Sequence, residues 1–200
     1  MHLTQKGLTK KVIEAVGLDL QSNPNKIPAD SHLGAHLDSP PHDNTKFHDR
    51  SVIGMLNFLA GSTCPDIAMA VHQCARFSHN PRANHTAAVK RIARYLIGTY
   101  DKGMIIHPHR DNCQLDCHVD ADFAGLYSTE STEHPDSARS RTGFVLSFAN
   151  IPLLWISKLQ TEIALSTTEA EYMALSHSLR EVLPCKELIQ SLAPLFGYNS

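Results

Sequence analysis

The stretch HVDADFAG, residues 118–125, places two aspartates, Asp120 and Asp122, one residue apart at the end of an apolar-leaning segment. In an extended strand, alternate side chains point to the same face, so both carboxylates would project from one side. Two like charges this close repel each other unless a cation or a strong hydrogen-bond donor lies between them. The pair is therefore either a solvated strand end or half of a metal site, and further ligands must decide between the two.

The bulk composition bounds the class of protein. With 200 residues, 42% of them hydrophobic and 19% charged, the chain has the composition of one globular domain or a small domain with an appendage. It contains no apolar run of the roughly 20 residues that a membrane span needs, and its start, MHLTQKGLTKK, lacks the apolar core of a signal peptide. Five scattered cysteines, an odd number, argue against a disulfide framework and favour a reducing compartment.

Charge is distributed unevenly along the chain. Residues 82–110 hold six basic side chains and one acid, Asp101, whereas residues 111–136 hold seven acids and no Lys or Arg. A basic segment followed by an acidic one fits a nucleic-acid track beside a cation site. The alternative is ordinary fluctuation of surface charge over windows of this length.

The first half is predicted to be mainly helical. A short strand at 1–5 and a helix at 8–18, stopped by Gly17, precede residues 21–50, whose Pro, Asn, Asp, His and Ser content predicts a linker or long surface loop. Helices are then expected at 49–63, from about 65, and at 84–99. The candidate core residues of the first and third, at helical spacing, are Val52, Ile53, Leu56, Leu59, Val89, Ile92, Ala93 and Leu96.

The second half changes pattern to short strands followed by one helix. Strand candidates separated by turn residues lie at 102–108, 113–123, 142–150 and 152–159. Ser166 and Glu169 form a Ser-x-x-Glu capping box, which marks the start of a helix. Pro184 lies inside that helical pattern and predicts a break or kink near residue 183.

The helix opened by Ser166 carries the acids that could extend a metal site. Glu169 and Glu171 are two residues apart, so on a helix they point about 200° away from each other, and only one can face the strands. Ala170, Met173, Ala174 and Leu175 frame Glu171 on the side expected to pack inward. The alternative is that both acids merely favour the positive end of the helix dipole.

Several ordered blocks of the sequence resemble one family. They include RSVIGMLNFLAGSTCPDIAMAV, ARFSHNPRANHTAAVKRIARYLIGT, HVDADFAG, SRTGFVLSF, PLLWISKLQTEIALSTTEAEYMALS and LREVLPCKELI. Together they resemble the part of copia-type retrotransposon Pol polyproteins where the reverse transcriptase runs into its ribonuclease H domain. The opening MHLTQKGLTKKVIEAVGL is also similar to the end of the polymerase region, so the resemblance touches nearly the whole chain and is weakest at 21–50.

The resemblance implies a site. Asp120 corresponds to the family's first-strand aspartate and Glu171 to its helix glutamate, two of four carboxylates that hold a pair of Mg²⁺ (or Mn²⁺) ions about 4 Å apart. Oxygen-only ligands suit these metals. Asp122, on the same strand face, is a further metal-ligand candidate. Arg141, between Ser140 and Thr142, is a candidate for touching a nucleic-acid phosphate, although a plain turn explains this segment equally well.

The resemblance also implies an organisation. Residues 1–20 would end the polymerase region, 21–50 form the linker, 51–100 a helical thumb or connection region, and 101–200 the N-terminal part of a ribonuclease H-like domain. The fold class expected is α/β, with helices followed by a truncated mixed sheet and one helix. The other two carboxylates, from a later strand and a later helix, are not found, so we expect little or no cleavage by this chain alone.

The resemblance further implies the partners and the compartment. The substrate would be an RNA–DNA hybrid, handled together with the rest of the Pol polyprotein. The location would be cytoplasmic, in the virus-like particle of the parent transposon, or nuclear. The oligomeric state is not predicted by any of these features.

Two other functions compete with catalysis. Lys90, Arg91 and Arg94 on one predicted helix could lie along a phosphate backbone, giving sequence-independent, salt-sensitive nucleic-acid binding; the alternative is a solvated helix face. A zinc site could use Cys113, Cys117 and the neighbouring residues His107, His109 and His118, but no second ligand pair follows at a typical spacing. The single Trp155 is predicted to lie in the core of the last strand, and Cys74 and Cys185 are predicted to be buried.

Overall fold

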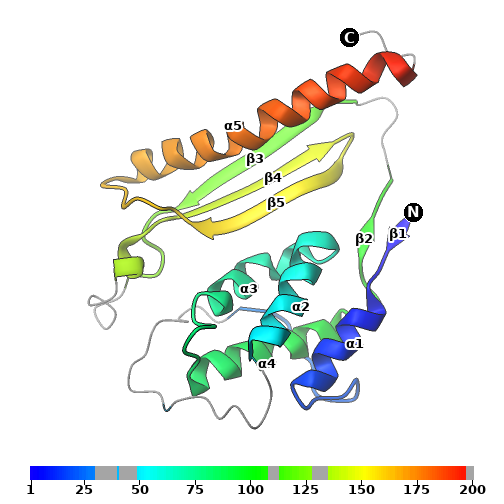
Figure 1. Ribbon diagram of the computed structural model, residues 1–200, viewed down its shortest axis with the longest axis vertical. Helices are drawn as coiled ribbons and strands as arrows, with labels where there is room; N and C mark the ends of the chain where they lie inside the picture. The colour runs from blue at the N-terminus through cyan, green and yellow to red at the C-terminus, as the bar shows by residue number, and fades with distance from the viewer. Residues whose placement is uncertain (30–39, 41–48, 108–112, 128–134, 197–200) are drawn as a thin grey trace. The chain divides into compact units, whose positions relative to one another are not determined.

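A computed structural model describes residues 1–29, 40, 49–107, 113–127 and 135–196 of the chain (Figure 1). These residues form two compact units. The first, here called the helical unit, comprises Met1–Ile106 and Ser128–Ser137, and the second, the sheet unit, comprises His107–Tyr127 and Ala138–Ser200. The fold is α/β, with five α-helices and two small antiparallel sheets in total among the described residues.

The core of the helical unit is built from four α-helices, with a 3-10 turn leading into the third. Their bounds are α1 Lys6–Ala15, α2 Asp49–Ser62, η1 Pro65–Ile67, α3 Ala68–Ala75 and α4 Ala83–Gly98. Gly17, with a φ of 73°, follows the end of α1, as its position in the sequence predicts. The opening at Pro65 and Asp66 is also confirmed, although it forms a 3-10 turn that leads into α3.

The predicted apolar faces of these helices meet in one core. Leu56 and Leu59 of α2 and Ile92 and Ala93 of α4 are fully buried there, beside Val12 of α1. At the edge of this core, the Tyr95 hydroxyl of α4 donates a hydrogen bond to the Asp66 carboxylate of η1. Burial and this bond raise the pKa of Tyr95 to about 12.

Two segments outside the helices also belong to this unit. The short strand β1 (His2–Leu3) pairs antiparallel with β2 (Met104–Ile105), so the strand candidate at 102–108 belongs here and does not join the larger sheet. The start of the predicted linker lies on α4: the amide of Asn25 donates to the carbonyl of Arg94 at 3.2 Å. Linker residues 30–39 and 41–48 are outside the described residues.

The sheet unit is a three-stranded antiparallel sheet with one long helix. Its bounds are β3 Leu115–Asp122, β4 Arg141–Phe148, β5 Ile151–Leu159 and α5 Thr167–Leu192. The strand order is β3-β4-β5, and neighbouring strands are consecutive in sequence. The expected mixed sheet is therefore wrong for the described strands, because both pairs are antiparallel. The two residues between β4 and β5, Ala149 and Asn150, form a direct turn that permits only an antiparallel pair.

Helix α5 begins as the capping box predicts. The backbone amide of Glu169 donates to the Ser166 hydroxyl at 3.1 Å, and the Glu169 carboxylate accepts from the amide of Leu165 at 2.7 Å. The sequence predicts a break or kink near residue 183, and the break is wrong, since the helix continues through Pro184 to Leu192. Pro184 lies on an exposed side of α5, where water can bond the carbonyl that loses its amide partner.

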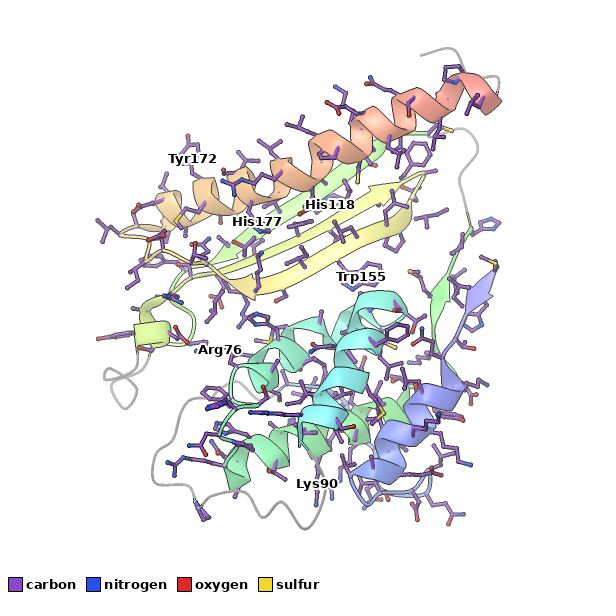
Figure 2. All side chains as sticks on the ribbon, in the orientation of Figure 1. Arg76, Lys90, His118, Trp155, Tyr172 and His177 are labelled. Carbon is purple, nitrogen blue, oxygen red and sulfur yellow. The ribbon has the colours of Figure 1, made fainter. Side chains whose placement is uncertain are left out.

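The sheet-unit core is smaller than predicted. Trp155 is half-buried and pairs with Val145 across β4 and β5, on the side of the sheet away from α5 (Figure 2), so it is not a central core residue. Leu175, expected to pack inward, is 45% exposed. All five cysteines are free thiols, as expected; Cys74 is buried and Cys185 is half-buried.

Candidate functional site

Asp120 lies on an open face of the sheet. On β3, the alternate residues His118, Asp120 and Asp122 are exposed, whereas Val119 and Ala121 between them are half-buried. Cross-strand pairing places Asp120 opposite Gly143 and Asp122 opposite Arg141. The two aspartates of the HVDADFAG stretch therefore share one face, as strand alternation predicts.

Helix α5 covers the other face. The Cys117 thiol of β3 bonds the Ser178 hydroxyl of α5, while burial raises the pKa of that thiol. Across the strands, Leu146 lies opposite Cys117 and is fully buried. Asp120 thus projects on the side of β3 opposite to the side that packs against α5.

Glu171 lies in the second turn of α5 and is exposed. Its backbone neighbour Ala170 is tied to the sheet, because buried Gln160 donates from Nε2 both to the Ala170 carbonyl at 2.8 Å and to the Thr142 hydroxyl at 3.1 Å. Thr142 is the cross-strand partner of Ala121, next to Asp120. Asp120 and Glu171 therefore flank the same end of the sheet, one on each side of the β3 layer.

The Asp122 carboxylate packs against the backbone of Gly125. A Cβ added to Gly125 would lie 2.0 Å from the Asp122 Oδ2 atom, so the carboxylate occupies space that only glycine leaves open. The turn is tight, since Ala124 has a φ of 48° and its amide donates to the Ser140 hydroxyl at 3.3 Å. Asp122 packs against the turn that follows β3, which a metal-ligand prediction from alternation alone did not anticipate.

The segment predicted to touch phosphate is buried. Ser140, Arg141 and Thr142 are 0%, 6% and 2% exposed. The Arg141 guanidinium donates from Nη1 to the Ser157 hydroxyl on β5 at 3.4 Å. In this arrangement, the three residues brace the start of β4 against its neighbours.

The basic residues predicted on one helix do share a region of α4. Arg94 is exposed, and Lys90 and Arg91 are half-buried; Lys90 projects outward from the helix (Figure 2). Ala87, one turn before Lys90 and Arg91 on the helix, is exposed and small, so a phosphate backbone could approach this face without a bulky obstacle.

A zinc site receives no geometric support within the described ranges. No group of three or more His, Cys, Asp or Glu side chains there is arranged to hold a metal ion, which covers Cys113, Cys117, His107 and His118. His109 lies outside the described residues. The two carboxylates Asp120 and Glu171 are oxygen ligands of the kind Mg²⁺ prefers, but among the described residues no third ligand joins them.

Two residues near this end of the sheet were missed by sequence reasoning. Gln160 is one, and its only signal was a polar residue at the end of an apolar strand. The other is His177 of α5, whose side chain points toward the sheet. Its ring lies 5.9 Å from that of Phe144, and its buried Nδ1 has no hydrogen-bond partner among the described residues. Burial, then the nearby cations Lys158 and Arg180, lower the pKa of His177, while Glu181 opposes the change.

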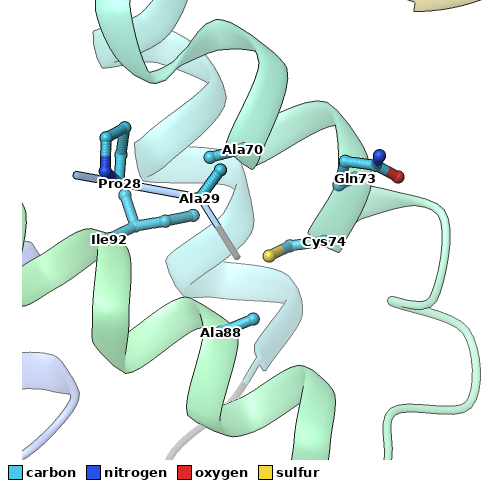
Figure 3. A pocket seen from close by; sticks show the side chains of 7 residues that line it. All are labelled: Pro28, Ala29, Ala70, Gln73, Cys74, Ala88 and Ile92. Carbon is cyan, nitrogen blue, oxygen red and sulfur yellow. The ribbon is translucent and has the colours of Figure 1, made fainter. Parts of the chain in front are cut away.

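The pocket of the helical unit offers no chemistry of this kind. It is a small space between α3, α4 and residues 28–29, lined among others by Cys74, Gln73 and Ile92 (Figure 3). Its lining carries no charged side chain, and Cys74 is 2% exposed. It reflects how Pro28 and Ala29 pack on the helices.

The sheet and helices make this an α/β protein. Comparison of its sequence with known proteins identifies the family. The chain is 31% identical, over 91% of its length, to the "Retrovirus-related Pol polyprotein from transposon RE2" of Arabidopsis thaliana. It is 33% identical, over 96% of its length, to the corresponding polyprotein from transposon TNT 1-94 of Nicotiana tabacum. An "Uncharacterized mitochondrial protein AtMg00810" of Arabidopsis thaliana is 30% identical over 91% of this chain and 71% of its own length.

The chain belongs to the family of Pol polyproteins of copia-type transposons and corresponds to a fragment of such a polyprotein. It spans 12% and 14% of the length of the two transposon polyproteins. No family model and no solved structure matches it. Within the described residues, no helix combines the length and apolar character needed to cross a bilayer.

Proposed function

We propose that this chain is the segment of a copia-type Pol polyprotein where the reverse transcriptase passes into the ribonuclease H domain. In the intact polyprotein, it would contribute to hydrolysis of the RNA strand of RNA–DNA hybrids. The observation that carries the proposal is the similarity of this chain to transposon Pol polyproteins over 91% and 96% of its length. Asp120 and Glu171 both lie toward the end of the sheet where Gln160 joins β4 to the first turns of α5.

Asp120 and Glu171 supply the oxygen ligands that Mg²⁺ and Mn²⁺ prefer, but among the described residues they lie on opposite sides of the β3 layer. In the intact polyprotein they would have to approach each other to hold an ion that activates a water and stabilises the leaving oxygen. The described residues bring no third ligand to them. The remaining ligands would come from other parts of the polyprotein, so we propose no cleavage step for this chain by itself.

The remaining residues at this end would keep the strand and helix in place. Gln160 fixes the first turns of α5 against β4. Asp122 fills the space beside Gly125, which shapes the turn after β3. These are positioning contacts, and they would set the direction of the two carboxylates without touching the substrate.

The test has two readouts, cleavage and metal binding. A labelled RNA–DNA hybrid is incubated with the chain and Mg²⁺ or Mn²⁺, beside Asp120→Asn and the matched control Asp116→Asn, which changes a neighbouring acid on β3. We expect no cleavage above the Asp120→Asn background, and weak Mn²⁺ binding that Asp120→Asn and Glu171→Gln abolish and Asp116→Asn retains.

Each result has a defined meaning. Cleavage that is lost in Asp120→Asn would show that the chain completes a site without further ligands. Mn²⁺ binding that is unaffected by either site variant would contradict the assignment of Asp120 and Glu171 as ligands.

A second function, nucleic-acid binding without catalysis, is supported by the exposed Arg94 beside Lys90 and Arg91 on α4. Binding of the hybrid would then weaken steeply with salt, and each phosphate contact removed would reduce the slope of log K against log salt by about 0.9. Arg94→Gln should reduce that slope, and Lys10→Gln on α1, also a basic helix residue, should leave it unchanged.

A further inference from the structure

Helix α5 carries a second apolar stripe on the side away from the sheet. Tyr172, Leu175, Leu179 and Leu183 are 69%, 45%, 42% and 55% exposed. Figure 2 shows Tyr172 projecting away from the sheet, whereas His177 points toward it. These four side chains line one continuous surface with Ser176 and Arg180.

The opposite side of the same helix is already packed. Ala170, Ala174 and Ser178 are fully or almost fully buried against the strands. A surface helix is normally apolar on one face only, and a helix that is apolar on both faces is normally covered on both. Large exposed apolar side chains that gather in one patch mark an interaction surface.

The outer stripe has the spacing of a coiled-coil seam. On the same side of α5, alternating steps of three and four residues connect Thr168, Tyr172, Leu175, Leu179, Val182, Lys186 and Ile189. This is the repeat that lets two helices pack side by side over several turns. Its single charged member, Lys186, determines which arrangement the stripe can accept.

We propose that the outer stripe of α5 binds the same stripe of a second copy of this chain, in antiparallel orientation. Residues whose numbers sum to 354 then face each other. Leu175 meets Leu179 of the second copy, and Tyr172 meets Val182 of the second copy. The contact is self-complementary, as a twofold dimer requires, and it does not depend on the proposed nuclease function.

Charge selects the orientation. In the antiparallel register, Lys186 faces Thr168 of the second copy and lies between the second copy's Glu169 and Glu171, which gives two favourable sets of contacts by symmetry. A parallel pairing at the same register would place Lys186 against Lys186, where like charges repel.

The size of the stripe sets the expected affinity. Four large side chains that are about half exposed amount to roughly 300 Å² of apolar surface per copy. Stable interfaces bury about 1,200 Å² or more in total, so this contact should give a weak dimer that forms only at high protein concentration.

The first experiment measures the association directly. The full chain is studied by sedimentation equilibrium, under reducing conditions, at concentrations from about 1 to 200 µM, which cover the micromolar range of weak dimers. We expect a monomer–dimer equilibrium. Leu175→Glu should raise the Kd about 100-fold, and the matched control Leu188→Glu, which is on the same helix, 59% exposed and off the stripe, should not change it.

A second set of variants tests the orientation. Lys186→Glu and Glu171→Lys should each raise the Kd about tenfold, and the double variant should restore it. Tyr172→Glu changes the most exposed member of the stripe and serves as a second disrupting variant if Leu175→Glu loses helical circular dichroism.

A chain that stays monomeric at every concentration would overturn the proposal, as would a dimer insensitive to Leu175→Glu and Tyr172→Glu. A dimer that those two variants disrupt, but that Lys186→Glu leaves intact, would overturn the antiparallel register.

Discussion

The two units of this protein differ in how completely they bury their apolar side chains. The helical unit encloses a core of fully buried aliphatic residues from α1, α2 and α4, with Leu56, Leu59 and Ile92 at its centre. In the sheet unit, Phe144 and Leu146 are the large apolar side chains that are buried among the described residues, beside several alanines. One unit has a closed core, and the other has a sheet that its own helix covers on a single face.

The difference follows from the number of layers in each unit. Four helices can surround a core from several sides, whereas one helix on a three-stranded sheet buries one stripe of each strand. Val145 and Leu153 are accordingly 40% and 49% exposed, and the outer stripe of α5 is open. The sheet unit should therefore be the less stable unit and the one whose stability responds to partners.

The largest effect should come from opening the closed core. Leu56→Ala removes a fully buried side chain from the cluster that joins α1, α2 and α4. It should lower the free energy of unfolding of the helical unit by about 3–4 kcal/mol, because the lost burial is accompanied by a cavity. Urea titration followed by circular dichroism measures this change.

The comparison between units supplies the control. Phe58→Ala changes a 60% exposed residue on the same helix and should cost much less. Trp155 is the single tryptophan and lies on β5, so its fluorescence reports the sheet unit. If Leu56→Ala shifts the Trp155 transition as much as the circular dichroism transition, the two units unfold together and the comparison fails.

A smaller loss is expected from the bond that closes the sheet unit. Gln160→Ala removes the donor to both Thr142 and the Ala170 carbonyl, and leaves a buried carbonyl without that partner. The Trp155 transition should lose about 1–3 kcal/mol. Gln190→Ala, on the exposed part of α5, is the matched control and should have no comparable effect. An equal loss in both variants would mean that Gln160 does not hold the helix to the sheet.

Prediction from the sequence was also more successful for the helical unit than for the sheet unit. In the helical unit, periodicity alone located the core, because residues such as Val52, Ile53 and Val89 repeat at helical spacing. In the sheet unit, the strands and the cap at Ser166 were also predicted from local patterns. What failed there, such as the inward placement of Leu175, depended on which side of α5 meets the sheet.

The candidate site was predictable only in part. Alternation correctly placed Asp120 and Asp122 on one face, since it requires nothing beyond the strand itself. The role of Asp122 beside Gly125 and the link through Gln160 could not be predicted, because both arise where residues far apart in sequence meet. The metal-ligand assignments of Asp120 and Glu171 remain predictions that depend on the family resemblance.

A third variant probes a local feature of α5. Ser166→Ala removes the side chain that accepts from the Glu169 amide at the start of the helix. Loss of such a cap typically costs about 1 kcal/mol, and the effect should appear in the Trp155 transition. Ser176→Ala, an exposed residue on the same helix, should be neutral. A neutral Ser166→Ala would show that the other contacts of the first turn, through Glu169 and Gln160, hold the start of α5 without the Ser166 cap.

The smallest expected effect is a pH dependence confined to the sheet unit. Burial, with Lys158 and Arg180, lowers the pKa of His177 in the folded state. The unfolded chain therefore binds a proton first, and stability falls as the pH drops below about 6.5, the ordinary histidine value, until the lowered pKa is passed. His177→Gln should flatten this part of the profile of the Trp155 transition, while His118→Gln, on the exposed face of β3, should retain it. A profile that His177→Gln leaves unchanged would assign the pH dependence to groups outside the contact between α5 and the sheet.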